Sequence, residues 1–260
     1  MEAPRSSMQL HCLGTAGYHP CEGRHTSCYF LPQAGLLLDA GTGLFRLPPL
    51  IETDELDILL SHAHLDHVAG LTFLIDVLYQ RPVQKVRVWG EAEKLAAVRE
   101  HLFADLMFPV PLDVDWRAVE EQEEIVLRGC RVKTMVQDHP GGSIGYRLDW
   151  QSGESLLYLT DTTGTETAEA IEFCSGADFM MHECYFGAEH RDFAEKTGHT
   201  WTGKLAKIAE LCQPKRLLLT HVNPLDPAPE KMLAEVRQSL CESPIDISMA
   251  DDGLVVPIFS

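Results

Sequence analysis

The chain has 260 residues, with 21 basic and 39 acidic side chains and a formal net charge of −18. Binding to long nucleic acid depends on Lys and Arg that neutralise many phosphates, so this charge disfavours that class of partner. No apolar run reaches the roughly 18 residues that a membrane helix needs, and the first residues lack the apolar core of a secretion signal. The eight cysteines are scattered and form no C-x-x-C pair. These features predict a cytoplasmic protein with reduced thiols and no membrane contact.

Short β-rich runs separated by turns fill the first third of the chain, and strand–helix alternation follows. We expect strands at 9–13, 27–31, 36–39, 55–60 and 85–89, and helices at 70–79 and 92–106.

The second half of the chain begins with strands and then alternates again. We expect strands at 125–136, 145–150, 156–160, 178–181 and 216–220, and helices at 165–174, 200–212 and 229–240. Thr200 is placed to cap the helix at 200–212. Two closing strands, 245–249 and 254–258, are joined through Asp251-Asp252-Gly253, which is a hairpin signal. This order predicts one α/β domain, 1–260, in which two layers of sheet carry helices on the outside.

The most informative segment is Ser61-His62-Ala63-His64-Leu65-Asp66-His67, which follows a predicted strand and precedes a predicted helix. Imidazole nitrogens and carboxylate oxygens are the usual nitrogen and oxygen ligands of zinc. His62 and His64 are two residues apart, so an extended chain presents both on one side. Asp66 and His67 then fall on the turn into the helix and can face a second ion. The alternative is a polar loop of unrelated histidines, but four such residues rarely gather by chance.

Four residues cannot complete the shells of two metal ions, so further ligands are expected from other strand ends. His139, Asp161 and His221 each come just after an apolar strand, where α/β enzymes place their chemistry. Taken alone, each would be read as a hydrogen-bonded loop residue. Together with the cluster they become candidate ligands.

The order of these residues, with Asp39 after an earlier strand, resembles the metallo-β-lactamase fold superfamily, whose five motifs are all present between residues 39 and 221. The resemblance implies a four-layer αββα sandwich, with two mixed β-sheets and outer helices, and a dinuclear metal site. His62, His64 and His139 would hold one ion, Asp66, His67 and His221 the other, and Asp161 would bridge them. Asp39 would support the cluster from behind. Zinc is the default metal for such a histidine-rich set, and manganese or iron are alternatives.

Two further segments are similar to the ribonuclease Z branch, in which a His-Glu pair and a Gly-His-Ser/Thr sequence precede the last metal histidine. Here they are Met181-His182-Glu183-Cys184 and Gly198-His199-Thr200. The resemblance implies a phosphodiesterase in which a metal-bound hydroxide, oriented by Asp66, attacks phosphorus. His199, held by Glu183, would donate a proton to the leaving oxygen. Since this branch is often dimeric, the resemblance also implies a homodimer.

Two departures from ribonuclease Z favour a small phosphodiester or a short nucleic acid as substrate over tRNA. The segment between His139 and Asp161 is mostly predicted strand, where ribonuclease Z commonly carries an inserted arm. After His221 the chain continues Val222-Asn223-Pro224 and lacks the arginine of the Ser-x-Arg-Tyr type continuation.

Two other classes of function stay open. One is a metal-dependent lactonase or thioesterase of the same fold, with an apolar pocket and no dependence on His199. The other is a metal-binding protein without catalysis.

A serine hydrolase is disfavoured because the G-x-S-x-G match at 141–145 precedes a predicted strand where that motif needs a helix. A second metal site at Cys12, Cys21 and Cys28 is disfavoured because their spacing does not match compact zinc modules. We expect the loops at 18–26 and 102–111 to shape the substrate pocket.

Overall fold

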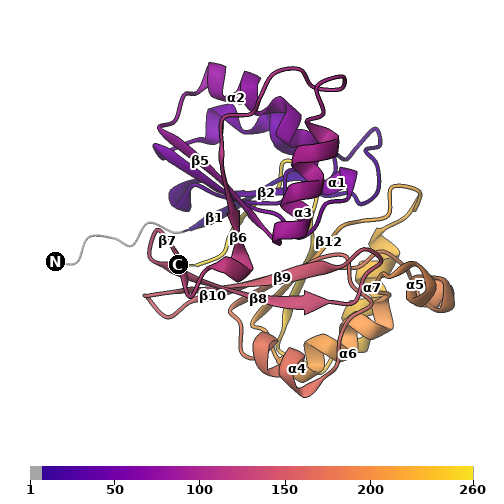
Figure 1. Cartoon of the computed structure of the whole chain (residues 1–260). Coiled ribbons are helices and arrows are strands. Elements are labelled where there is room, and N and C mark those ends of the chain that lie inside the picture. The colour runs from indigo at the N-terminus through magenta and orange to yellow at the C-terminus, as the bar shows by residue number, and fades with distance from the viewer. Residues whose placement is uncertain (1–7, 260) are drawn as a thin grey trace. The chain divides into compact units, whose positions relative to one another are not determined.

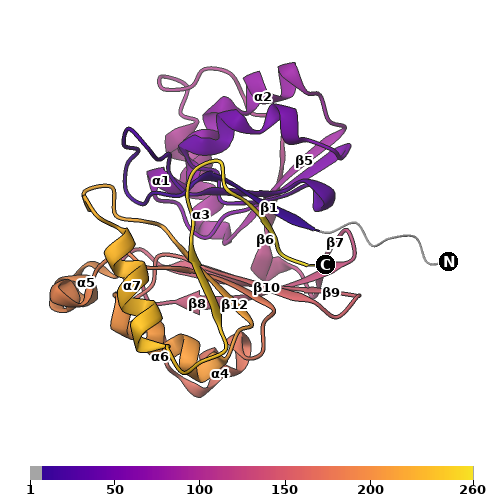
Figure 2. The same ribbon diagram turned by 180° about the vertical axis from the view of Figure 1, so that it is seen from behind.

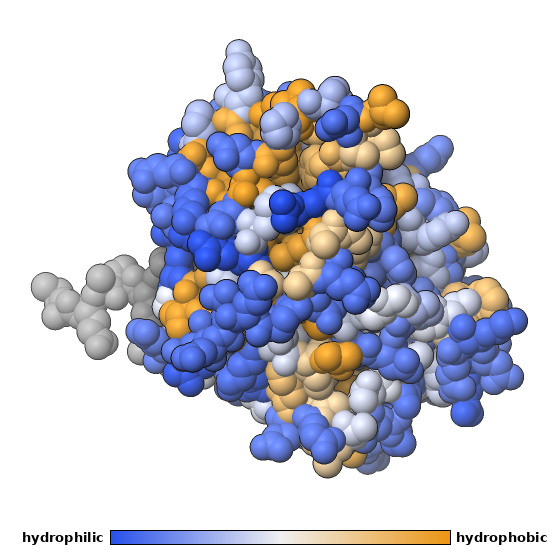
Figure 3. Space-filling model, in the orientation of Figure 1, coloured by the Kyte–Doolittle hydropathy of each residue, from blue (hydrophilic) through white to orange (hydrophobic). Residues whose placement is uncertain are grey.

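The structure is a computed structural model that describes residues 8–259. The chain divides into two compact units, Met1–Arg128 with Asp251–Ser260 (unit 1) and Gly129–Ala250 (unit 2). Within residues 8–259, no helix is both long and apolar enough to cross a membrane. Hydrophilic side chains make up most of the face seen in Figure 3, in keeping with the net charge of −18.

Unit 1 is built on a mixed β-sheet with the strand order β14-β1-β2-β3-β4-β5-β6. The strands are β1 (Gln9–Gly14), β2 (Cys28–Leu31), β3 (Leu36–Leu38), β4 (Glu55–Leu59), β5 (Lys85–Gly90), β6 (Asp115–Ala118) and β14 (Val255–Pro257). β14, β1, β2 and β3 pair antiparallel, and β3 to β6 pair parallel. The helices are α1 (Leu65–Val68), α2 (Leu74–Gln80) and α3 (Ala92–Ala97) (Figure 1). From behind, the yellow C-terminal segment runs beside β1 (Figure 2).

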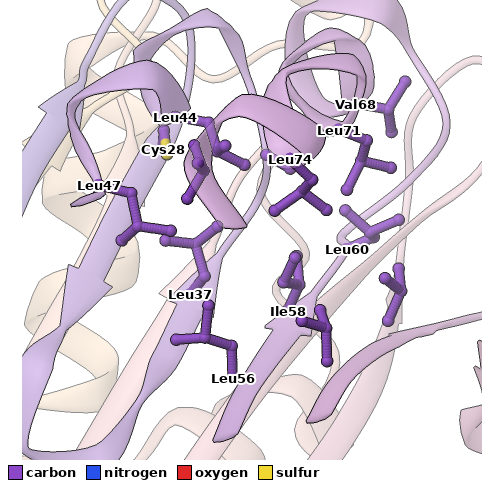
Figure 4. Packing of buried hydrophobic residues seen from close by; sticks show 14 of the residues in the cluster. Cys28, Leu37, Leu44, Leu47, Leu56, Ile58, Leu60, Val68, Leu71 and Leu74 are labelled. Carbon is purple, nitrogen blue, oxygen red and sulfur yellow. The ribbon is translucent and has the colours of Figure 1, made fainter. Parts of the chain in front are cut away.

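The core of unit 1 explains why the His-rich turn follows β4. Leu56, Ile58 and Leu60 alternate along that strand and present one buried face. They pack in one cluster with Leu71 and Leu74 from the helical segment that follows (Figure 4). Burial of each such side chain contributes about 1.5–3 kcal/mol. The turn at 61–67 is therefore held between two well-packed elements.

Unit 2 is built on a second mixed sheet, in which the strands run in the order β13-β12-β11-β10-β9-β8. They are β8 (Cys130–Gln137), β9 (Ser143–Trp150), β10 (Ser155–Leu159), β11 (Phe179–Glu183), β12 (Arg216–Thr220) and β13 (Asp246–Met249). β8, β9 and β10 pair antiparallel, and β10 to β13 pair parallel. The carboxyl ends of β10, β11 and β12 therefore meet at one edge of the sheet.

The helices of unit 2 are α4 (Ala168–Cys174), α5 (Arg191–Thr197), α6 (Thr202–Cys212) and α7 (Glu230–Ser239). α4, α6 and α7 lie together along the sheet (Figure 1). Their buried side chains, such as Leu205, Ala209 and Val236, form one cluster with Leu157 and Leu217 of the strands. Two mixed sheets with helices confirm the predicted α/β class.

The expected C-terminal hairpin is wrong. β13 pairs with β12 of unit 2, whereas β14 pairs with β1 of unit 1. The Asp251-Asp252-Gly253 segment carries the chain from one sheet to the other, and the Gly253 amide donates to Cys12 O at 2.8 Å. A hairpin signal specifies a turn, but long-range partners decide which strands pair.

Three local expectations also differ from the structure, and two short elements were missed. Thr200 does not cap α6, because its hydroxyl donates to Thr162 O at 2.6 Å and Trp201 occupies the cap position. The strand expected at 125–136 is split into β7 (Ile125–Leu127) and β8 by a turn whose Arg128 and Gly129 have positive φ. The helix expected at 92–106 changes after Ala97 to a π-helical turn, Val98–Leu102. The short elements β6 and α5 were not predicted.

Candidate functional site

Three of the predicted site residues share an uncommon backbone conformation directly after a strand. Asp39 follows β3, and Asp161 and His221 come at the ends of β10 and β12; their φ angles are 55°, 47° and 52°. The left-handed region costs about 1–2 kcal/mol for a residue with a side chain, and such strain gathers at functional sites. At each position the turn ends the strand, and the three side chains are buried.

In unit 1, the Asp39 carboxylate organises the His-rich turn. It is fully buried and accepts hydrogen bonds from Ser61 N at 2.7 Å and Ser61 Oγ at 2.8 Å. His67 Nδ1 lies 2.6 Å from Asp39 Oδ2 and donates to it. This bond leaves the Nε2 atom of neutral His67 with a lone pair, which is the arrangement of a metal-ligating histidine.

Asp66 lies on the other side of the His67 ring. Its Oδ2 atom is 3.2 Å from His67 Nε2 and accepts a hydrogen bond from Tyr18 N at 2.6 Å. With His67 Nδ1 donating to Asp39, the neutral ring turns its Nε2 lone pair towards this carboxylate oxygen, and a bound cation or a second proton on the ring satisfies both groups. The rings of His62 and His64 are close by, with centroids 4.5 Å apart, and the His62 ring is 4.3 Å from that of His67. His62 is buried and His64 is exposed.

In unit 2, the Asp161 carboxylate lies between two histidines. Its Oδ2 is 3.3 Å from His139 Nε2, and its Oδ1 is 3.1 Å from His221 Nε2. His139 Nδ1 donates to Gly198 O at 2.8 Å, so His139 Nε2 carries the lone pair. Each carboxylate oxygen thus faces one imidazole nitrogen, which suits a carboxylate shared between two cations.

Gly198 is required where it accepts the bond from His139. Its φ is 82°, a left-handed conformation at the end of α5. A Cβ at this position would lie 2.1 Å from Pro140 Cδ and 3.0 Å from His139 Nδ1. The glycine of the Gly-His-Thr segment therefore allows the close approach that orients the His139 ring.

Glu183 and His199 form the expected pair. The fully buried Glu183 accepts a hydrogen bond from Thr162 N at 2.5 Å, and its Oε2 is 3.1 Å from His199 Nδ1. Tyr185 stacks on the His199 ring, with centroids 4.5 Å apart and an interplanar angle of 17°. His221 lies close enough that one ligand atom each of Glu183, His199 and His221 falls within 4.8 Å of the others. With Nδ1 bound to Glu183, His199 Nε2 is the atom left to move a proton.

The neighbours of this pair serve packing. Burial lowers the pKa of His182, despite a bond from Nδ1 to Glu183 O at 2.8 Å. Burial also raises the pKa of the Cys184 thiol, which keeps it protonated and apolar.

The residues of the two disfavoured sites, the G-x-S-x-G serine and the N-terminal cysteines, have structural roles instead. Ser143 is buried in β9 and donates to Thr160 O at 3.2 Å, so it is no nucleophile. Burial raises the pKa of Cys12 to about 12, and no metal-ligand group found in residues 8–259 includes Cys12, Cys21 or Cys28.

The structure thus divides the predicted site residues between the units. Unit 1 holds Asp39, His62, His64, Asp66 and His67, and unit 2 holds His139, Asp161, Glu183, His199 and His221. Sequence reasoning missed three contributors: the Tyr18 amide, the Gly198 carbonyl and the Tyr185 ring. Only Gly198 had a signal, because it stands within a recognised motif.

Comparisons with known proteins agree with the fold. Among similar curated proteins, ribonuclease Z of Kineococcus radiotolerans is 25% identical, with 97% of this chain and 96% of that protein covered. Ribonuclease Z of Archaeoglobus fulgidus is 24% identical, with 81% and 86% covered.

Solved structures show the same fold. The short form of human tRNase Z has a TM-score of 0.75 at 21% identity, covering 96% of this chain and 99% of that one. A diphosphatase from the PhnP family has a TM-score of 0.71 at 20% identity, covering 96% of both chains.

The resemblance predicted from the sequence is confirmed by these matches. A family model described as the β-lactamase superfamily domain matches residues 35–222, which is more than half of the chain. The chain therefore belongs to the β-lactamase superfamily.

Proposed function

We propose that this protein is a metal-dependent phosphodiesterase of the ribonuclease Z-like type, with residues 1–260 acting as one hydrolase domain. The observation that carries the proposal is the set of imidazole nitrogens that lie against the carboxylate oxygens of Asp66 and Asp161. Imidazole nitrogens and carboxylate oxygens gathered in this way are the usual ligands of zinc. The matches to ribonuclease Z proteins support the choice of phosphodiesters among the substrates of the superfamily.

Two divalent ions, zinc by default, fit this donor set. The proposed ligands are His62, His64 and His139 for one ion, and Asp66, His67 and His221 for the other, with Asp161 shared. When bound, the ions would make water a stronger acid and take up negative charge of the phosphoryl group.

The chain's own residues then divide the work of proton transfer. Asp66, fixed by the Tyr18 amide, accepts a proton from the attacking water and orients it. The water oxygen forms the new bond to phosphorus as the bond to the leaving oxygen breaks. That oxygen receives a proton from Nε2 of protonated His199, whose Nδ1 is held by Glu183. Tyr185 covers one face of the His199 ring and limits its rotation.

The proposed substrate is a small phosphodiester or a short nucleic acid. Strands β9 and β10 fill the segment between His139 and Asp161, so no inserted arm is available there to hold a long substrate. The net charge of −18 also opposes long nucleic acid. We propose a cytoplasmic homodimer; none of the eight cysteines is in a disulfide, which suits a reducing compartment.

Hydrolysis of an aryl phosphodiester by metal-free protein refilled with zinc or manganese tests the proposal, beside a lactone and a thioester. Asp161→Ala and His199→Ala are measured in parallel, with the exposed His101→Ala as the matched control. We expect metal-dependent phosphodiester turnover that falls in the first two variants only. Lactone or thioester turnover unaffected by His199→Ala would support the alternative hydrolase. Two bound ions with no turnover of any substrate would reject the catalytic proposal.

A further inference from the structure

Asp252 is a buried carboxylate that the proposed chemistry does not use. It lies in the segment between β13 and β14, and its side chain is 6% exposed. Its Oδ1 accepts a hydrogen bond from Thr15 Oγ1 at 2.8 Å, and its Oδ2 accepts from His25 N at 2.8 Å. Arg46 Nη1 pairs with the same Oδ2 at 2.5 Å. A carboxylate with this many donors around it holds its partners firmly.

Two of the residues bound by Asp252, Thr15 and His25, are the two ends of one loop. Thr15 follows β1, and His25 precedes β2. The backbone closes the same loop, since Thr15 N and Ala16 N both donate to His25 O, at 2.8 and 2.9 Å. Arg24 Nη1 adds a bond to Thr15 Oγ1 at 2.6 Å. The loop is thus fixed at its base by a side chain from the other end of the sequence.

The tip of this loop touches a proposed metal ligand. Tyr18 has a φ of 60°, and its amide donates to Asp66 Oδ2 at 2.6 Å. The Tyr18 side chain is 72% exposed, so packing of the ring does not hold this left-handed conformation. Strained backbone persists only where the surroundings determine it, and here the surroundings are the clamped loop base and the Asp66 carboxylate.

We propose that Asp252 is a positioning residue for the proposed metal centre: it clamps the loop at 15–25 so that the Tyr18 amide orients Asp66. The inference rests on the proposed function, because it treats Asp66 as a metal ligand. Substitution of a residue that orients a metal ligand by hydrogen bonding typically changes metal affinity by about 10–100-fold. The effect of Asp252 should therefore be visible in metal binding without any substrate.

Titration of the metal-free full-length chain with Mn²⁺, followed by electron paramagnetic resonance, tests the inference. We expect Asp252→Ala to weaken one of two sites by about 10-fold or more and to leave the other within about twofold. Asp246→Asn removes the same charge from a residue that is 71% exposed and pairs with Arg216 in unit 2, outside the clamped loop, and should leave both affinities unchanged. Circular dichroism confirms that each variant is folded.

Variants of Tyr18 separate positioning from general destabilisation. Tyr18→Gly keeps the amide and suits a positive φ, so it should bind Mn²⁺ more tightly than Tyr18→Pro. Tyr18→Pro removes the amide hydrogen and holds φ at about −65°, far from the observed 60°, so the contact with Asp66 is lost and the same site as in Asp252→Ala should weaken. Because both act through one hydrogen bond, the double variant should be no weaker than the worse single variant.

Two outcomes contradict the inference and differ from each other. If the unaltered chain binds two ions and Asp252→Ala binds them equally well, Asp252 does not position Asp66 and the proposed function stands. If the unaltered chain binds no divalent ion, both the inference and the proposed function fail.

Discussion

The two ends of the parallel strands β10, β11 and β12 differ in how their polar groups are arranged. At the amino ends, Asp178 accepts hydrogen bonds from Ser155 N at 2.8 Å and Ser155 Oγ at 3.3 Å, and pairs with Lys215 Nζ at 2.6 Å. Every contact there joins a donor to an acceptor. At the carboxyl ends, Asp161 faces the Nε2 atoms of His139 and His221, and both Asp161 and His221 have left-handed backbone.

This difference indicates which end of the sheet stabilises the fold and which end is built for function. Matched partners at the amino ends favour folding on their own. The buried carboxylate and imidazole groups at the carboxyl ends, with left-handed backbone at Asp161 and His221, stabilise the fold less until cations bind, as expected for a functional site. Substitutions at the two ends should therefore separate activity from stability.

The largest effect is expected for Asp161, at the carboxyl ends of the strands. Asp161→Asn keeps the shape of the side chain and tolerates a positive φ, but it removes the charge that suits two cations. We expect a loss of phosphodiesterase activity on the order of 10³-fold or more, together with an unchanged or raised melting temperature of the metal-free protein. Turnover measures the predicted loss of activity, and calorimetry measures the melting temperature. A variant that loses both activity and stability would contradict the comparison.

His199 should show a smaller effect that depends on the leaving group. If His199 Nε2 protonates the leaving oxygen, His199→Ala should lower kcat by about 10²–10⁴-fold for an alkyl diester. A nitrophenolate leaves without needing a proton, so the loss with a nitrophenyl diester should be much smaller. Equal losses with both substrates would mean that His199 has a different role.

Gly198 affects both metal binding and stability, because its carbonyl accepts the hydrogen bond that orients His139 and its backbone has a positive φ. Gly198→Ala should destabilise the protein by about 1–3 kcal/mol, since a Cβ would lie 2.1 Å from Pro140 Cδ at a φ of 82°. Displacement of His139 should also weaken metal binding by about 10–100-fold. Urea unfolding and metal titration measure these effects.

Gly176 provides the matched control for this substitution. It also has a positive φ, 64°, but nothing lies within 4 Å of an added Cβ. Gly176→Ala should therefore lower stability by about 1 kcal/mol and leave metal affinity unchanged. Equal metal affinities in the two variants would show that Gly198 does not orient His139.

Much of the candidate site could be predicted because its residues stand in order along the sequence. The cluster His62 to His67, the strand-end residues Asp161 and His221, and the Glu183–His199 pair were all visible as residue types in a pattern. The strand-and-helix order likewise predicted two mixed sheets with helices, because periodicity reports which faces are buried.

What the sequence did not reveal depends on contacts between distant residues. Nothing near Tyr18 indicates that its amide binds Asp66, and nothing near Asp252 indicates that it holds Thr15 and His25. The predicted hairpin through 251–253 failed for the same reason, since strand pairing is decided by partners far along the chain. The left-handed conformations of Asp39 and His221 were also hidden, because these residue types tolerate a positive φ but do not require it.

The smallest effect is expected at the matched end of the sheet. Burial raises the pKa of Asp178, but the ion pair with Lys215 and the hydrogen bond from Ser155 outweigh it and hold the pKa below its usual value. A carboxyl group with a lowered folded pKa stabilises the fold above its unfolded pKa, near 3.9, and loses that contribution as the pH falls through the folded pKa. Asp178→Asn should therefore lower stability slightly at pH 7 and match the unaltered protein once the pH lies below the lowered pKa of Asp178. Urea unfolding across this range measures the difference, while phosphodiester turnover at pH 7 should stay unchanged. A loss of turnover in a folded Asp178→Asn variant would show that the two ends of the sheet are coupled, and the separation argued here would be wrong.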